Sequence, residues 1–259
     1  MPTARPYSAN LGFLWTELAL PDAVRAAAAA GFAAVELHWP YDVPAAEVAA
    51  VLKETGLSCM GLNTVRGDVA GGENGLAALP GREDEARAAI DQAFAYGAAI
   101  GAANVHVMGG CVALDEGLST FTANLAYACE RAEESGIGVV IEPLNRFDVP
   151  GYAIHTIDDG LCVLDALGRR EAKLMFDCYH VAREGCDVVA TFSRVRDRVG
   201  HVQFAGVPDR GPPDRGTVDY AAVLPALRRL GWSAPFGAEY RPDGPTDGSL
   251  AWLDALETG

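Results

Sequence analysis

Short apolar segments that can form buried strands alternate with helix-like segments along the whole chain. Eight such apolar segments occur, at residues 7–13, 32–38, 57–63, 104–110, 138–144, 172–178, 201–207 and 235–241. None is joined to the next by the tight turn of a β-hairpin, so the pattern favours parallel strands linked by helices. Strand and helix alternating eight times predict a closed (β/α)8 barrel, the α/β fold known as a TIM barrel.

The segments between the predicted strands carry helix signals. Helical spacing of apolar residues is found at residues 23–30, 45–53, 83–99, 118–134, 220–230 and 249–256. Glycines suited to helix C-caps follow several of these segments, for example Gly56, Gly136 and Gly168. The chain has 259 residues, close to the roughly 250 of a typical barrel. We therefore expect one domain over residues 1–259.

Two glycine- and proline-rich segments lack a helix pattern. Residues 63–82 follow the third predicted strand, and residues 208–217 follow the seventh. Both are expected on the face of the barrel where the strands end, which is the face that carries the active sites of TIM barrels. The first segment is long enough to form a mobile loop over the mouth of the barrel.

Composition and charge exclude several classes of partner. Half of the residues are apolar and 21% are charged, which is ordinary for a globular protein. A formal net charge of −15 disfavours nucleic acid and anionic membranes. The amino terminus lacks the apolar core of a signal peptide, and no apolar run has the roughly 18 residues of a membrane span. We expect a cytoplasmic protein whose six cysteines are reduced and mostly buried.

Oxygen-bearing side chains stand at or near the ends of the last four predicted strands. These residues are Glu142, Asp177, Gln203 and Glu239. One glutamate after an apolar run means little, but the ends of consecutive barrel strands converge on one mouth. Three carboxylates at one place would repel each other, and a divalent cation removes that repulsion. An all-oxygen set favours Mg²⁺ or Mn²⁺ over zinc, so we expect one such ion.

Two histidines lie close to these residues in the sequence. His201 precedes Gln203 by two positions and so points to the same side of its strand. It is either a partner that supports the metal ligands or a hydrogen-bonded core histidine, and the sequence does not separate the two. His180 follows Asp177 by three residues, beyond the strand end, which favours a contact with substrate.

These motifs together resemble a known family. The segments IEPLNRFD, DCYH, GHVQFAGVPDR and GAEYRP, with GLAALPGRE after the third strand, occur in the chain at compatible spacing. Their combination is similar to the hydroxypyruvate isomerase family of the xylose isomerase-like TIM barrels, over nearly the whole chain. The resemblance implies a fourth metal ligand at Gln203, where related ketose epimerases usually have histidine.

The resemblance also implies the residues that hold the substrate. By motif match these are Asp148, His180 and Arg210. Asn63 and Arg66, at the end of the third strand and just after it, are further residues expected to contact the substrate. The rim departs from the family pattern, with Val65-Arg66-Gly67-Asp68 after the third strand, and Gly211-Pro212 and Thr217 after the seventh. The identity of the substrate is therefore less constrained than the metal site. Family members often associate, so a homo-oligomer is open, although no helix shows an apolar outer stripe.

The predicted activity is an isomerisation of the aldose–ketose type. Glu142 and Glu239 are expected to move a proton between neighbouring carbons of a small hydroxy-carbonyl substrate, through an enediolate. The resemblance implies interconversion of hydroxypyruvate and tartronate semialdehyde. A 2-oxo-tetronate isomerase or a free ketose epimerase is the alternative at the same site. A DNA-repair endonuclease is disfavoured by the five histidines and the charge of −15, and a non-catalytic metal-binding barrel is the remaining class.

Overall fold

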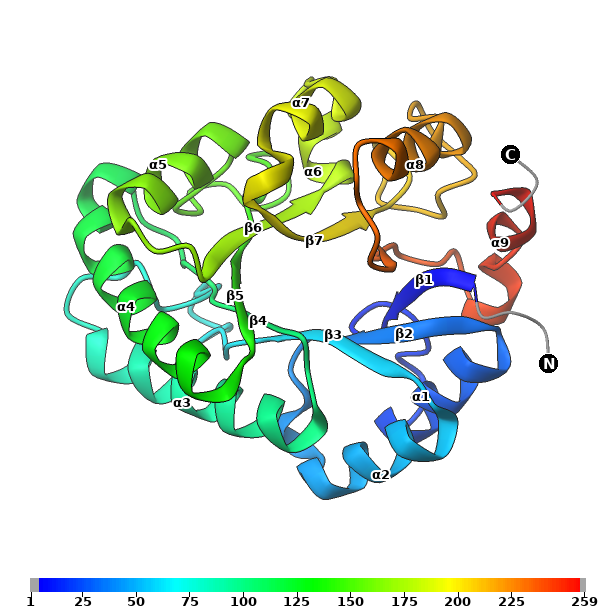
Figure 1. Ribbon diagram of the computed structural model, residues 1–259, viewed down its shortest axis with the longest axis horizontal. Helices are drawn as coiled ribbons and strands as arrows, with labels where there is room; N and C mark the ends of the chain where they lie inside the picture. The colour runs from blue at the N-terminus through cyan, green and yellow to red at the C-terminus, as the bar shows by residue number, and fades with distance from the viewer. Residues whose placement is uncertain (1–4, 257–259) are drawn as a thin grey trace.

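The predicted barrel is present in the structure, a computed structural model that describes residues 5–256. Within this range the strands pair in chain order, all in parallel, and β8 pairs with β1 to close the ring (Figure 1). The strands are β1 (Arg5–Asn10), β2 (Phe32–Leu37), β3 (Ser58–Asn63), β4 (Asn104–His106), β5 (Gly138–Ile141), β6 (Ala172–Asp177), β7 (Val199–Phe204) and β8 (Phe236–Ala238). All eight predicted strands are thus confirmed.

Helices surround the strands on the outside of the ring (Figure 1). They are α1 (Leu20–Ala29), α2 (Ala45–Thr55), α3 (Glu83–Ile100), α4 (Leu114–Ser135), α5 (Ile157–Leu167), α6 (Cys178–Arg183), α7 (Val188–Val195), α8 (Tyr220–Arg229) and α9 (Trp252–Ala255). Gly56, Gly136 and Gly168 end α2, α4 and α5 in the left-handed conformation that glycine adopts without strain. Short 3-10 helices occupy Pro40–Asp42, Arg196–Arg198 and Thr246–Ser249.

The last predicted helix, at residues 249–256, is shorter than expected. Residues Thr246–Ser249 form a 3-10 turn instead, and α9 begins only at Trp252. The hydroxyl of Ser249 donates to the carbonyl of Thr246 at 2.7 Å and lies 2.7 Å from the hydroxyl of Tyr240. These local bonds hold the chain in a turn and compete with the start of a helix.

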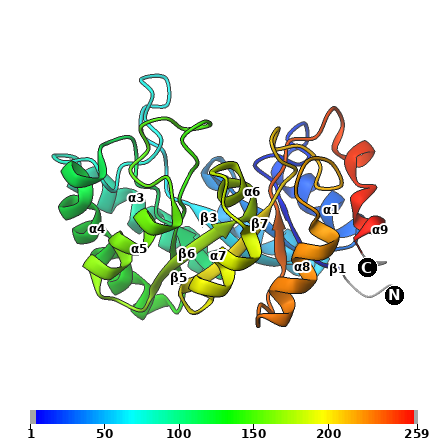
Figure 2. The ribbon, with the colours of Figure 1, turned by 90° about the horizontal axis from the view of Figure 1, so that it is seen from above.

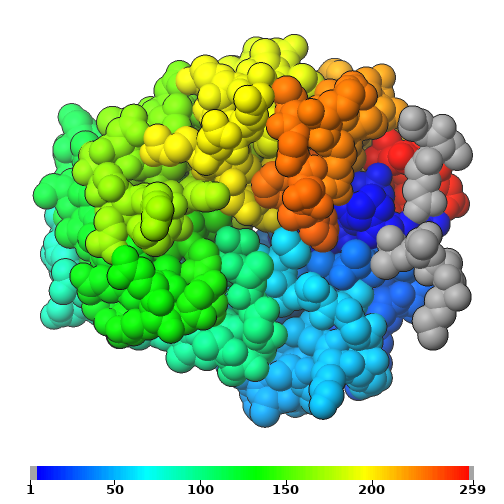
Figure 3. Space-filling view, in the orientation of Figure 1, coloured from blue at the N-terminus to red at the C-terminus, as the bar shows by residue number. Residues whose placement is uncertain are grey.

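The interior of the barrel is a packed core. In Figure 3 side chains fill the centre that the ribbon of Figure 1 leaves open. Apolar side chains contribute to it, for example Ala34, two residues before Glu36, and Val140, two residues before Glu142, both fully buried. The polar exceptions gather toward the carboxyl ends of the strands. A buried polar group needs a partner, so this end of the barrel is where function is expected.

Long loops rise from the barrel on one side, as Figure 2 shows for the segments that follow β3 and β5. Residues 67–72 of the loop after β3 are exposed. The second half of the same loop is anchored, because Leu76, Ala77 and Ala78 are buried and the amide of Asn124 donates to the carbonyl of Ala77. The predicted mobility of this loop therefore concerns its first half alone.

Two further expectations concern membranes and thiols. Among the described residues, no helix combines the length and the apolar character needed to cross a bilayer. The cysteines are free thiols, as predicted, but they are not mostly buried: Cys59, Cys129 and Cys178 are buried, whereas Cys111, Cys162 and Cys186 are exposed. The exposed three lie in loops or on the outer side of a helix, where no barrel packing covers them.

Candidate active site

The four predicted metal ligands converge at the carboxyl end of the barrel. Glu142 follows β5, Asp177 ends β6, Gln203 lies in β7 and Glu239 follows β8. In the strand register Asp177 pairs with Gln203, and Gln203 pairs with Gly237. The four residues are between 2% and 5% exposed. Three acidic groups and one amide thus share a buried space at the mouth of the barrel.

Several oxygens of this group lack a partner. Oε1 of Glu142, Oδ2 of Asp177 and Oε1 of Gln203 are buried and accept no hydrogen bond from any described residue. Buried acceptors of this kind are rare in proteins, because each one has lost its bonds to water. Three of them on consecutive strands fit the oxygen ligands of one divalent cation. The residues present therefore suit a hard ion such as Mg²⁺ or Mn²⁺.

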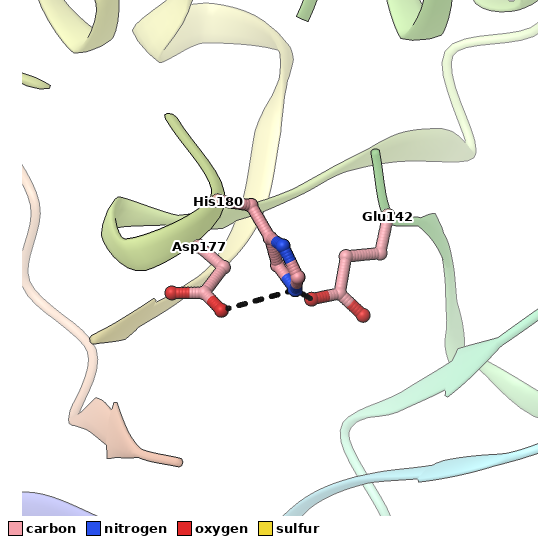
Figure 4. A group of neighbouring side chains, drawn as sticks. All are labelled: Glu142, Asp177 and His180. Carbon is pink, nitrogen blue, oxygen red and sulfur yellow. Dashed lines mark ion pairs between the residues drawn. The ribbon is translucent and has the colours of Figure 1, made fainter. Parts of the chain in front are cut away.

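His180 lies next to two of these carboxylates (Figure 4). Its Nε2 is 3.6 Å from Oε1 of Glu142 and 3.6 Å from Oδ2 of Asp177. The ligand atoms of the three residues lie within 4.8 Å of one another, which is close enough to hold a metal ion. The backbone N–H of Asn145 donates to Nδ1 of His180 at 3.0 Å. In a neutral ring the proton is then on Nε2, which makes this atom a hydrogen-bond donor toward the site and not a ligand.

Glu239 has the most contacts of the four residues. Its Oε1 accepts from Asn10 at 3.0 Å and lies 2.8 Å from Nε2 of His38. Its Oε2 accepts from Nη2 of Arg210 at 2.5 Å. The same nitrogen of Arg210 is 3.5 Å from Oδ2 of Asp177. The predicted substrate residue Arg210 therefore reaches the carboxylates themselves.

The shared space shifts the pKa values of the carboxyl groups in different directions. Burial, followed by the charges of Glu239 and Asp177, raises the pKa of Glu142 well above its usual value. Burial also raises the pKa of Asp177 to about 7, against the opposing charge of Arg210. Burial alone would raise the pKa of Glu239, but Arg210 and His38 outweigh it and hold this pKa at about 2. Arg210 thus compensates one part of the group, and a second cation would compensate the rest.

The other predicted substrate residues lie around the mouth. Asp148 is exposed, and its Oδ2 accepts from the hydroxyl of Tyr179 at 2.8 Å. Asn63 ends β3 and is half-buried. Arg66 is also half-buried, and its guanidinium carbon lies 3.9 Å from the centre of the Trp39 ring. These residues do not contact the carboxylates, and they mark the rim of the site.

His201 lies inside the barrel, one layer below the site. It is 1% exposed, and its Nε2 is 3.1 Å from Oε1 of Glu36. Glu36 in turn accepts a hydrogen bond from the amide of Gln203 at 2.7 Å. His201 thus lies beside the residue that contacts Gln203, and neither of its ring nitrogens forms a hydrogen bond within residues 5–256.

Four polar residues near the site were not predicted from the sequence. They lie in or directly after the first, second and fourth strands, and they are Asn10, Glu36, His38 and His106. Nδ1 of His106 is 3.8 Å from Oε2 of Glu142, and burial lowers the pKa of His106 to about 4. For Asn10, His38 and His106 the available signal was the same as for the predicted ligands, a polar residue at the end of an apolar run, whereas Glu36 lies within its run.

The family is decided by comparison with known proteins. The model of the xylose isomerase-like TIM barrel family matches residues 24–256. This chain belongs to that family. A 2-oxo-tetronate isomerase of Cupriavidus necator is 41% identical, over 95% of this chain and 96% of the other. Hydroxypyruvate isomerase of Escherichia coli is 32% identical, over 96% of this chain and 98% of the other.

A solved structure agrees with this assignment. The crystal structure of a Brucella melitensis protein named "AP endonuclease, family 2" has a TM-score of 0.93 and 33% identity, over 97% of this chain and 98% of that one. The family model and the two isomerase relatives confirm the resemblance drawn from the sequence motifs and the predicted class of enzyme: the chain is an isomerase of the xylose isomerase-like family.

Proposed function

We propose that this chain is a divalent-cation-dependent isomerase of short hydroxy-carbonyl acids, and that it shifts the carbonyl group between neighbouring carbons. The observation that carries the proposal is the set of buried oxygens without partners on Glu142, Asp177 and Gln203. With Glu239 they offer a cation four ligands from four consecutive strand ends. When bound, the cation supplies a Lewis acid that makes the C–H bond beside the substrate's carbonyl more acidic.

Glu142 and Glu239 are the residues that move the proton. Each carries a second carboxylate oxygen besides the one used as a ligand, and both residues are buried. One glutamate removes the proton from the carbon that carries the hydroxyl group, and an enediolate forms. The other returns a proton to the former carbonyl carbon, and the hydroxyl proton passes to the former carbonyl oxygen, so that the number of protons and electrons is unchanged.

The neighbouring residues support this transfer by binding and orientation. The Nε2–H group of His180 faces Glu142 and Asp177 and can donate a hydrogen bond to a substrate oxygen. Asn10 and His38 hold Oε1 of Glu239 and so fix the direction of its other oxygen. Restricting the base in this way favours one reactive geometry.

Among the candidate substrates, 2-oxo-tetronate is favoured over hydroxypyruvate. The Cupriavidus necator relative, which is 41% identical, is named a 2-oxo-tetronate isomerase. The Escherichia coli relative, which is 32% identical, is named a hydroxypyruvate isomerase. Both substrates carry a carboxylate, which calls for a cationic partner at the rim. Arg66 is suited to this role, because it forms no ion pair with any residue in the described range and is held over the Trp39 ring.

The test compares these acids directly. The purified chain is given Mn²⁺ or Mg²⁺ with 2-oxo-tetronate, hydroxypyruvate or a neutral ketose of similar length, and the products are identified by NMR. We expect 2-oxo-tetronate to be converted to the 3-oxo acid with the highest kcat/KM, and chelation of the cation to stop the reaction. Faster conversion of the neutral ketose would contradict the proposed class of substrate.

The name given to the Brucella melitensis protein raises cleavage of DNA as another activity. The formal charge of −15 opposes binding to a phosphate backbone. Incubation with DNA that contains an abasic site, under the same conditions, tests this alternative. We expect no strand cleavage above that of the Asp177→Asn variant.

A further inference from the structure

Glu36 is a buried acid to which the proposed reaction assigns no role. It lies in β2 and is 4% exposed. Its Oε2 accepts a hydrogen bond from Nε2 of Gln203 in β7 at 2.7 Å. In the closed barrel β1 and β8 stand between β2 and β7. The two side chains therefore meet across the interior of the barrel and not between neighbouring strands.

This contact decides which end of the Gln203 amide faces the site. A carboxylate oxygen accepts hydrogen bonds, and the amide group that faces Oε2 of Glu36 is the NH₂ group. The amide oxygen then points the other way. This oxygen, Oε1 of Gln203, is buried and has no partner among residues 5–256. Glu36 thus holds the NH₂ end of the amide and leaves the amide oxygen of this candidate ligand without a partner.

Glu36 is itself held in place. Its Oε1 accepts from the hydroxyl of Ser8 at 2.5 Å and lies 3.1 Å from Nε2 of His201. Gly237 provides the room for the pair, because a Cβ atom there would stand 2.2 Å from Oε1 of Glu36 and 2.8 Å from Cγ of Gln203. With both oxygens of Glu36 engaged, neither its side chain nor the Gln203 amide is free to rotate.

We propose that Glu36 is a positioning residue that makes Gln203 an oxygen ligand of the divalent cation. The inference rests on the proposed cation site. Without an acceptor-only partner at position 36, the amide can turn its NH₂ group toward Glu142 and Asp177. These carboxylates attract a donor, so the turned amide would compete with the cation for them.

The experiment is a double-mutant cycle on the affinity for Mn²⁺ alone, measured by calorimetry on the full chain. Glu36→Gln keeps the size of the side chain but can donate as well as accept, so it no longer fixes the amide. We expect Mn²⁺ to bind about 10–100-fold more weakly, as for other residues that orient a metal ligand. In a Gln203→Ala background the same change should weaken binding by about threefold or less, since no amide is left to orient.

The cycle separates the inference from the proposed function. If Glu36→Gln has the same effect with and without Gln203, Glu36 acts through its charge or through the fold, and the inference is wrong. If Gln203→Ala itself leaves Mn²⁺ affinity unchanged, the proposed cation site is wrong. Glu47→Gln on the exposed side of α2 serves as the matched control, because it makes the same change of side chain away from Gln203, and it should keep the parent affinity.

Glu36→Asp is a second variant for the case that Glu36→Gln does not fold. Aspartate keeps the charge and accepts only, but its side chain is shorter and holds the amide less firmly. We expect a smaller loss of Mn²⁺ affinity than for Glu36→Gln, and no loss in the Gln203→Ala background. A loss of equal size in both backgrounds would again contradict the inference.

Discussion

Nη2 of Arg210 lies 2.5 Å from Oε2 of Glu239, inside the group of buried oxygens that we propose to bind a cation. The guanidinium is also held between two rings, with its carbon 5.1 Å from the ring centres of Phe13 and Tyr179. Glu239 and Asp177 outweigh the effect of burial and raise the pKa of Arg210 above its usual value. Arg210 and a divalent cation therefore compete for the same carboxylate charge.

Replacement of Arg210 tests this competition. Arg210→Met keeps much of the length of the side chain but removes its charge, and we expect this variant to bind Mn²⁺ about tenfold more tightly. The reason is that the charge-assisted hydrogen bond to Glu239, worth roughly 1.5–3 kcal/mol, no longer competes with the ion for the carboxylate. Turnover should fall, because the substrate loses a donor. Calorimetry and steady-state kinetics measure the two effects, and weaker Mn²⁺ binding in this variant would show that the guanidinium helps the ion.

The ligands themselves give the second prediction. Glu142→Gln and Asp177→Asn each remove one buried negative charge from the proposed site. We expect both variants to fold and to bind Mn²⁺ at least about 100-fold more weakly, because a neutral amide is a poorer ligand than a carboxylate. Asp165→Asn, on the outer surface beside Arg198, is the control and should bind as the parent does. Parent-like affinity in both site variants would exclude these two residues as ligands.

Arg66 gives the third prediction, which concerns the substrate. Arg66→Leu removes the cation that we propose to bind the substrate carboxylate and leaves the four ligands untouched. We expect KM for 2-oxo-tetronate to rise about 10–100-fold, the loss of one charge-assisted contact of roughly 1.5–3 kcal/mol. The KM for a neutral ketose should stay within a factor of about three. An equal rise for acid and neutral substrate would mean that Arg66 acts on the loop and not on the carboxylate.

The sequence was sufficient to predict the barrel, because the signal for each strand and each helix lies within its own segment of the chain. Each strand is an apolar run and each helix has its own spacing, and the ends of parallel strands meet by geometry. The same rule predicted that Glu142, Asp177, Gln203 and Glu239 would lie together, and they do. This rule requires no knowledge of the conformations of individual side chains.

The contacts between these residues could not be predicted in this way. Glu36 and Gln203 are 167 positions apart and meet across the barrel interior. A glutamate within an apolar run gives no sign of which strand it will face. Arg210 reaches Glu239 from the loop after β7, at a residue with a φ of 55°, a left-handed backbone that the sequence around it did not signal. Such pairs depend on the closed barrel and on loop conformation.

The last prediction concerns the route of the hydrogen. A direct hydride shift between carbons keeps the hydrogen out of contact with water, whereas proton transfer through Glu142 and Glu239 allows exchange with solvent. We expect the reaction in D₂O to place deuterium on the product carbon that receives the proton. Product free of deuterium after many turnovers would favour a hydride shift and remove the reason for pairing these two glutamates.

The variant Glu239→Gln completes this test. It removes a base and a ligand charge at once, and we expect kcat to fall by about 10²–10⁴-fold. The exchange of the substrate C–H with D₂O, followed by NMR before product accumulates, then tells which glutamate acts first. If exchange persists in Glu239→Gln and is lost in Glu142→Gln, Glu142 removes the proton and Glu239 returns it. The opposite pattern reverses the two roles, and exchange that persists in both variants would mean that neither glutamate is the base.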